Sequence, residues 1–255
     1  MTRNFHIGIM GNLFSGKTTL MDAMAKDPYK KGFSMLMDGA EVHTFTERVE
    51  KGSLADECLA LFYQDRVANI FPTETAFLFM RTSQQREIRH LMTRETKRGS
   101  LILEDRPFLD GPEVFVKRMI SSGEMPQAHA KLYRTMLCQT LRHEHVRLPD
   151  LTVYLRCEPG HLEKRRLQRA TNGDTYASTI TEDYLRQIHE CYENLAAGWK
   201  QTLSRYQEYA IVPPDSELLT LPADIDMNEH PDYVHVVAGT IREKVRRMIA
   251  ARSSL

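Results

Sequence analysis

The chain has 255 residues, of which 42% are hydrophobic and 27% charged, and its 34 basic residues balance its 34 acidic ones. This composition is ordinary for a globular protein, and the balanced charge supplies no net field that would favour nucleic acid or a membrane surface as a partner. No apolar run approaches the length that a bilayer span requires. The first predicted strand begins so close to Met1 that no room is left for a signal peptide.

The cysteines also favour a cytoplasmic protein. They are far apart in the sequence and form no C-x-x-C motif, which indicates free thiols in a reducing compartment. The four are Cys58, Cys138, Cys157 and Cys191.

The strongest motif lies within the first twenty residues. An apolar run over residues 5–10 leads into Gly11-Asn12-Leu13-Phe14-Ser15-Gly16-Lys17-Thr18, which matches the phosphate-loop pattern G-x-x-x-x-G-K-[ST] at every fixed position. Leucine and methionine then recur at helical spacing. The context is therefore strand, glycine loop and helix, which the motif requires.

The residue types of this loop suit a nucleoside triphosphate. Gly11 and Gly16 permit a tight turn whose N–H groups converge on phosphate oxygens, and the helix that follows adds a positive N-terminus. Lys17 can reach the β and γ phosphates, and the Thr18 hydroxyl can ligate Mg²⁺. We therefore predict an ATP and Mg²⁺ site. Its phosphate-loop residues are Gly11, Asn12, Ser15, Gly16, Lys17, Thr18 and Thr19.

Further along the chain, apolar strand patterns alternate with helical ones. A loop is predicted over 27–32, an insertion of undefined structure over 33–41, and a second strand over 42–46. A helix begins after Ser53, and Pro72 is predicted to open a long helix that ends at Gly99. The remaining expected elements are strands over 101–103, 151–155 and 218–221, and helices over 112–123, 127–145, 158–169, 181–199 and 231–251.

This alternation predicts a single α/β domain over residues 1–255, with a five-stranded parallel sheet covered by helices on both faces. Ligands of such sheets bind at the carboxyl ends of the strands. Glu47 follows the second strand, and Asp105 and Arg106 follow the third, so these side chains should share one crevice with the phosphate loop. An acid, an arginine, a lysine and a Mg²⁺-binding threonine in one cleft suit phosphoryl transfer.

The motifs together resemble the deoxyribonucleoside kinase family, the group of deoxycytidine, deoxyguanosine and deoxyadenosine kinases, and they follow its order over most of the chain. The matching segments are Gly11 to Thr19, Thr46 to Glu50, Leu61 to Asp65, Asp105 to Phe108, Tyr154 to Arg156, Arg165 to Arg169 and Asp183 to Glu190. The resemblance implies a three-layer P-loop kinase fold with a lid at about 164–178. It also implies transfer of the ATP γ-phosphate to the 5′-hydroxyl of a deoxyribonucleoside by a homodimer, whose interface could involve the apolar stretches at 72–98 and 112–145.

The resemblance implies roles for individual residues. Glu47 is similar to the general base that takes the proton from the 5′-hydroxyl, and Arg106 to the arginine that steadies the 5′-oxygen and the transferring phosphate. Asp105 is similar to the acid that helps hold Mg²⁺, and Arg106 fixes this register against the neighbouring Glu104. Tyr63 is similar to the tyrosine that hydrogen-bonds the sugar 3′-hydroxyl.

The basic run Lys164, Arg165, Arg166 and Arg169 occupies the position of the family's lid. Lid arginines close over the phosphates and stabilise transition-state charge, and Arg165 and Arg169 are the best matched. The other reading of such a run is a solvated helix face.

Four positions depart from the family pattern. Pro107 stands where the family usually has serine. Thr171 and Gly173 replace an arginine and a glutamate of the lid, which leaves Asp174 as the candidate for the sugar-binding acid. Glu74 stands where a glutamine typically reads the base.

Glu74 and Arg81 are two helical turns apart and can face one side of the same helix. An ionised carboxylate accepts from the N1–H and N2–H₂ donors of guanine, and a guanidinium donates to O6 and N7. The pair therefore predicts a purine deoxynucleoside, guanine ahead of adenine, for which Gly111 leaves room. The alternative is that Glu74 and Arg81 only neutralise each other.

Two other functions stay open from the sequence. Residues 149–155 also resemble thymidylate kinases, and Arg48 and Arg81 could then bind the phosphate of a nucleoside monophosphate. A catalytically degenerate structural homologue is the third possibility, although such a protein would more often have lost Lys17, Glu47 or Arg106.

Overall fold

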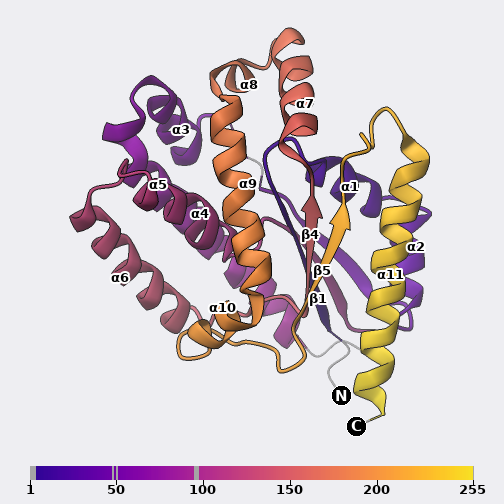
Figure 1. The fold of residues 1–255 in the computed structure, drawn as a ribbon. Helices are drawn as coiled ribbons and strands as arrows, with labels where there is room; N and C mark the ends of the chain where they lie inside the picture. The colour runs from indigo at the N-terminus through magenta and orange to yellow at the C-terminus, as the bar shows by residue number, and fades with distance from the viewer. Residues whose placement is uncertain (1–3, 48, 50, 95–97, 255) are drawn as a thin grey trace.

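The computed structural model describes residues 4–47, 49, 51–94 and 98–254 (Figure 1). Its sheet is parallel and five-stranded, as the sequence predicts, and the strands lie in the order β2-β3-β1-β4-β5. The strands are β1 (Phe5–Gly11), β2 (Glu41–Phe45), β3 (Ser100–Asp105), β4 (Leu151–Arg156) and β5 (Glu217–Pro222).

The burial of the three central strands explains why the sequence shows them as apolar runs. Every residue of β1 and β3 is buried, and so is all of β4 up to its last residue. Parallel strands covered on both faces read as continuous apolar runs rather than as alternating ones. Ile9 of β1 is paired in register with both Asp105 and Val153, so the ends of β1, β3 and β4 meet at one edge.

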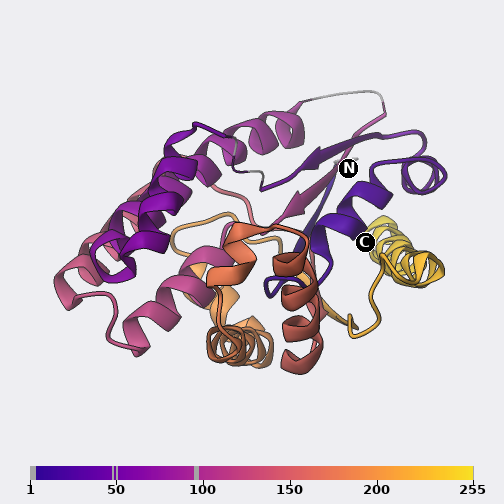
Figure 2. The ribbon, with the colours of Figure 1, turned by 90° about the horizontal axis from the view of Figure 1, so that it is seen from above.

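Helices cover both faces of the sheet (Figures 1 and 2). One face carries α1 (Lys17–Met24), α2 (Tyr29–Met35) and α11 (Pro231–Ser253). The other elements are α3 (Leu54–Gln64), α4 (Arg66–Thr93), the π-helix η1 (Gly111–Val116), α5 (Lys117–Ser121), α6 (Gln127–His143), α7 (Pro159–Thr171), α8 (Thr175–Thr179), α9 (Glu182–Ala197) and α10 (Trp199–Tyr206). Helices α7 and α8 lie above the carboxyl ends of the strands (Figure 1).

The prediction that Pro72 opens the long helix is wrong. Helix α4 begins at Arg66, and the Asp65 side chain caps it by accepting from the Ala68 N–H at 3.1 Å. Pro72 lies inside the helix, where a proline normally costs about 3 kcal/mol. Packing offsets this cost, because Ile70 is buried and the Thr73 hydroxyl donates to the Cys58 carbonyl of α3 at 2.9 Å.

The predicted loop and insertion between residues 27 and 41 are also partly wrong. Helix α2 occupies Tyr29–Met35, and Phe33 is its single buried residue. One apolar anchor in seven residues is too little to produce a visible helical period. The predicted helix over 181–199 is divided at Gly198 into α9 and α10.

Other local predictions are confirmed. The Ser53 and Thr181 hydroxyls cap α3 and α9 by accepting from the N–H groups of Asp56 and Tyr184. All four cysteines are free thiols. None of the helices in the described part of the chain has the length and hydropathy needed to cross a bilayer.

Candidate active site

The phosphate loop after β1 has the geometry of an anion-binding turn. Gly11 has a φ of 155°, and a Cβ there would lie 2.8 Å from Ser15 Oγ and 2.9 Å from the Leu155 carbonyl oxygen. Gly16, with a φ of 90°, directly precedes α1. Ser15 Oγ is buried and has no hydrogen-bond partner within the described residues. The loop therefore requires its glycines, and it leaves a buried hydroxyl for a ligand.

Lys17 is folded back onto this loop. Its Nζ donates to the carbonyls of Gly11 at 2.8 Å and Asn12 at 2.7 Å. Burial, together with the nearby Arg106 guanidinium, lowers the pKa of the Lys17 ammonium to about 8. A bound phosphate would supply the negative charge that this buried ammonium needs.

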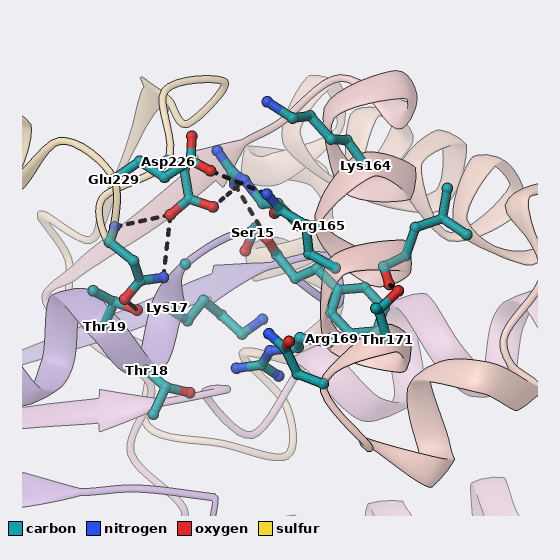
Figure 3. A pocket seen from close by; sticks show the side chains of 16 residues that line it. Ser15, Lys17, Thr18, Thr19, Lys164, Arg165, Arg169, Thr171, Asp226 and Glu229 are labelled. Carbon is teal, nitrogen blue, oxygen red and sulfur yellow. Dashed lines mark hydrogen bonds and ion pairs between the residues drawn. The ribbon is translucent and has the colours of Figure 1, made fainter.

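A cavity of about 830 Å³ opens beside the loop. The side chains of Lys17, Thr18 and Thr19 face those of Arg169 and Thr171 across it (Figure 3). All of the predicted loop residues from Ser15 to Thr19 line this cavity. Its volume lies within the range of roughly 300–1,000 Å³ that small-molecule sites occupy.

The predicted lid arginines differ in their contacts. Arg165 is buried, and its guanidinium donates to the carbonyls of Phe14 at 3.1 Å, Ala223 at 2.7 Å and Asp224 at 2.9 Å. Its Nε pairs with Asp226 at 3.2 Å (Figure 3). Arg165 thus ties the phosphate loop to the loop after β5, and most of its donors are already used.

Arg169 is the freer of the two. Its side chain is 60% exposed, and its nearest carboxylate, Asp174, is 4.0 Å away. The guanidinium lies over the Phe14 ring at 5.7 Å. Phe14 has a φ of 64°, a left-handed conformation that is rare for a bulky residue, and this turn aims its ring at α7.

The end of β3 separates two acidic neighbours. Glu104 is fully buried in the sheet, where it meets His6 at 2.9 Å and accepts from Gln85 at 2.7 Å. Asp105 points to the opposite side, and its Oδ1 is buried with no hydrogen-bond partner within the described residues. Burial raises the Asp105 pKa, against the nearby charges of Lys17 and Arg106. Strand alternation therefore places Asp105, not Glu104, at the site.

Arg106 turns sharply out of β3 with a φ of 55°. Its Nε contacts Glu47 Oε2 at 2.7 Å, and the other carboxylate oxygen, Oε1, receives Arg81 Nη2 at 2.5 Å. The Arg106 guanidinium also lies 4.9 Å from the centre of the Phe115 ring. Glu47 is therefore clamped between two buried guanidiniums, and removal of one partner from such a cluster typically costs about 3–5 kcal/mol.

Sequence reasoning missed two members of this cluster. Asp110 is buried and pairs with Arg106 Nη1 at 3.0 Å, and the Tyr192 hydroxyl donates to the same Asp110 oxygen at 2.8 Å. Both residues hold Arg106 in place from behind. The sequence signal that could have identified Asp110 is its i,i+4 spacing from Arg106. This spacing indicates an ion pair only where the chain is helical.

A second, smaller cavity of about 190 Å³ touches the phosphate loop at Leu13, which directly precedes Phe14 of the larger cavity. It collects every predicted catalytic and substrate residue outside the loop and the lid, namely Glu47, Tyr63, Glu74, Arg81 and Arg106. Its other walls are apolar or aromatic and were not predicted. Among them are Leu13, Phe62, Phe77, Phe115, Met119 and Tyr184.

Tyr63 forms one side of this smaller cavity. Its ring packs on Tyr176 of α8 at 5.0 Å, and burial raises its hydroxyl pKa. Asp174, the predicted sugar-binding acid, instead caps α8 by accepting from the Ala177 N–H at 3.0 Å, and it lines neither cavity. Helix α8 thus contacts the smaller cavity through the Tyr176 ring, which packs on Tyr63.

Glu74 and Arg81 face the same cavity, as their spacing predicts. No direct ion pair joins the two side chains, and Arg81 instead pairs with Glu47. The charge of Arg81 still acts on Glu74 and opposes the rise of its pKa, so the alternative interpretation is only partly overturned. The prediction that Gly111 leaves room for a purine is wrong. A Cβ there would lie 2.1 Å from Arg81 Nη1, so the missing side chain accommodates Arg81 rather than a base.

Two departures from the family pattern can also be placed. Pro107 packs against β1, where a Cβ on Gly8 would lie 2.9 Å from Pro107 Cβ. Thr171 ends α7 and donates to the Leu167 carbonyl at 2.9 Å. Arg48 lies outside the described residues.

Comparisons with known proteins bear on the family and the fold of this chain. A family profile described as deoxynucleoside kinase matches residues 7–231. A structure of deoxyadenosine kinase from M. mycoides with the products dCMP and a flexible dCDP has a TM-score of 0.64 and 20% identity, covering 93% of this chain and 99% of that one. Another structure of that kinase, with dATP bound, has the same TM-score and identity and covers 92% and 98%. No curated protein matches the sequence.

Proposed function

Because this chain belongs to the deoxynucleoside kinase family, whose members phosphorylate deoxynucleosides with ATP, we propose that its two cavities hold the two substrates of that reaction. ATP occupies the larger cavity, and the deoxynucleoside occupies the smaller one. The observation that carries this assignment is that consecutive residues of the phosphate loop line the two cavities. Leu13 lines the smaller cavity, and the next residue, Phe14, lines the larger one.

Glu47 and Arg106 perform the central chemistry. Each Glu47 oxygen has one lone pair in an arginine contact and another that can accept the 5′-hydroxyl proton. Arg106 and Lys17 neutralise charge on the transferring phosphate. Such transition states are loose, so catalysis rests on positioning and electrostatics more than on a strong base. A carboxylate held by two arginines suits that role.

The residues at the carboxyl end of β3 and in the first turn of α1 fit a Mg²⁺ ion. Asp105 offers an unpartnered buried oxygen, and Thr18 offers an exposed hydroxyl. Mg²⁺ prefers one or two protein oxygens together with phosphates and water. When bound, the ion would neutralise charge on the β and γ phosphates. Arg169 approaches the same phosphates from the lid, which we assign to residues 164–178.

The acceptor is a purine deoxynucleoside. Its base lies against Glu74 among the aromatic walls, and its sugar lies at Tyr63. The nucleoside monophosphate alternative has less support, since Arg81, one of its two candidate phosphate ligands, is bound to Glu47. The other candidate, Arg48, lies outside the described residues. The degenerate alternative is disfavoured, because Lys17, Glu47 and Arg106 adjoin one another at one site.

We also propose a cytoplasmic homodimer. Helices α4 and α6 present large exposed apolar side chains, among them Val67 and Phe79 on α4 and Leu132 on α6. Burying such a surface against a second copy would remove it from water. This interface is the one that the family resemblance suggests.

The function is tested by measuring phosphate transfer from ATP to every deoxynucleoside and every deoxynucleoside monophosphate in parallel. Glu47→Gln should lower turnover by about a hundredfold or more with ATP affinity unchanged. Glu41→Gln, at an exposed carboxylate on the adjoining strand, serves as the control. Near-normal turnover in Glu47→Gln would remove this carboxylate from the mechanism, and a preference for monophosphates would overturn the nucleoside assignment.

A further inference from the structure

Glu74 is a buried carboxyl group in the wall of the smaller cavity. The residue is 6% exposed, and no group in the described part of the chain donates a hydrogen bond to it. Buried carboxylates ordinarily have such donors. A ligand in the cavity is therefore the natural partner of this group.

Arg81, the cation that acts most strongly on Glu74 among the described residues, does not neutralise it by direct contact. Arg81 is held at Glu47 by a 2.5 Å contact, and its Nη1 lies so close to Gly111 that a Cβ there would be 2.1 Å away. Burial raises the Glu74 pKa to about 7, although the charge of Arg81 opposes this change. Both the neutral acid and the carboxylate are consequently accessible near neutral pH.

The other charged and polar groups that face Glu74 come from several elements. Arg81 on α4 and Arg106 after β3 stay cationic, and Glu47 after β2 is paired with both. The remaining groups are tyrosine hydroxyls whose pKa burial raises, on α3, α6 and α9. They are Tyr63, Tyr133 and Tyr184. Glu74 thus differs from these arginines and tyrosines, which keep their charge between pH 6 and pH 8.

The two forms of a carboxyl group recognise different bases. A neutral acid has one O–H donor and one carbonyl acceptor, whereas a carboxylate only accepts. Adenine presents the acceptor N1 beside its N6 amino group, which complements the neutral acid. Guanine presents N1–H beside its N2 amino group, two donors that complement the carboxylate. Neither base gains or loses a proton between pH 6 and pH 8.

We propose that the protonation state of Glu74 selects the purine: the neutral acid favours deoxyadenosine, and the carboxylate favours deoxyguanosine. This inference rests on the proposed purine nucleoside site and adds a pH-dependent selectivity to it. A glutamine at this position would present a fixed donor and acceptor pair and would have no such dependence.

The first measurement is the ratio of kcat/KM for deoxyguanosine to kcat/KM for deoxyadenosine from pH 6 to pH 8. The carboxylate population rises about tenfold over this interval while the neutral population falls about tenfold, so the ratio should rise by about a hundredfold. Glu74→Gln should favour deoxyadenosine with a ratio independent of pH. Glu87→Gln, at an exposed position of the same helix, should behave as the wild type.

The second measurement is proton exchange on nucleoside binding without ATP, by calorimetry at pH 7 in buffers of different ionisation enthalpy. Deoxyguanosine should release protons and deoxyadenosine should take them up, which a merely structural role of Glu74 would not produce. This test uses the wild type alone, so it holds even if Glu74→Gln fails to fold. Phosphorylation of both purines with a flat ratio and no opposite proton exchange would overturn the inference, whereas phosphorylation of neither would overturn the proposed function.

Discussion

Replacing Glu74 by glutamine should stabilise the fold, and the stabilisation should grow with pH. Glutamine has nearly the same shape as glutamate but never carries the charge that burial penalises. The Glu74 pKa is raised from 4.5 to about 7 in the folded chain. Because the folded pKa lies above the unfolded one, the favourable contribution of the neutral acid is complete below pH 4.5 and is lost as the pH rises through 7.

The size of this effect follows from the two pKa values. One pKa unit corresponds to about 1.4 kcal/mol. Ionised Glu74 therefore lowers the unfolding free energy by about 3 kcal/mol at pH 8 but only by about 1 kcal/mol at pH 5.5. The advantage of Glu74→Gln over the wild type should increase by about 2 kcal/mol between these two pH values.

Urea unfolding of both proteins at pH 5.5 and pH 8 measures this difference. Groups that titrate elsewhere contribute equally to the two proteins and cancel in the comparison. Glu87→Gln on the exposed face of α4 should show no pH-dependent advantage. If the advantage of Glu74→Gln is the same at both pH values, Glu74 does not titrate in this interval and the reasoning about its environment is wrong.

Two further predictions concern the phosphate loop. ATP binding at pH 8 should be accompanied by the uptake of about half a proton, because the bound phosphate raises the Lys17 pKa from its lowered value of about 8. Calorimetry in two buffers of different ionisation enthalpy measures this uptake. The variant Lys17→Ala should abolish it. Thr18→Ala should increase the Mg²⁺ concentration needed for half-maximal turnover by about tenfold, whereas Thr171→Ala across the same cavity should not. An unchanged Mg²⁺ requirement in Thr18→Ala would remove that hydroxyl from the metal site.

The parts of the site that the sequence predicts are those that depend on short-range patterns. The phosphate loop is a contiguous motif, and the positions of Glu47, Asp105 and Arg106 follow from the rule that parallel strands end at one edge. The choice between Glu104 and Asp105 also follows, once the strand is correctly bounded, from the alternation of side chains. No long-range information is needed for these steps.

The unpredicted features depend on contacts between distant segments. Whether Arg81 meets Glu74 on its own helix or Glu47 after β2 is decided by the packing of α4 against η1. Tyr192 reaches Asp110 from 82 residues away. The true start of α4 was missed because Asp65 ends one helix and caps the next, and this role is visible only when both helices are in place.

In the proposed site, Arg81 links base recognition to catalysis. Its guanidinium stands between the base wall at Glu74 and the carboxylate of Glu47, and the bare backbone of Gly111 makes its close approach possible. A charge that appears on Glu74 attracts Arg81 and so weakens its hold on Glu47, whereas a neutral Glu74 leaves that hold intact. The acceptor base and the catalytic carboxylate are therefore not electrostatically independent. If Glu74 selects the purine as we propose, the same residue also sets how firmly Glu47, the proposed acceptor of the 5′-hydroxyl proton, is held.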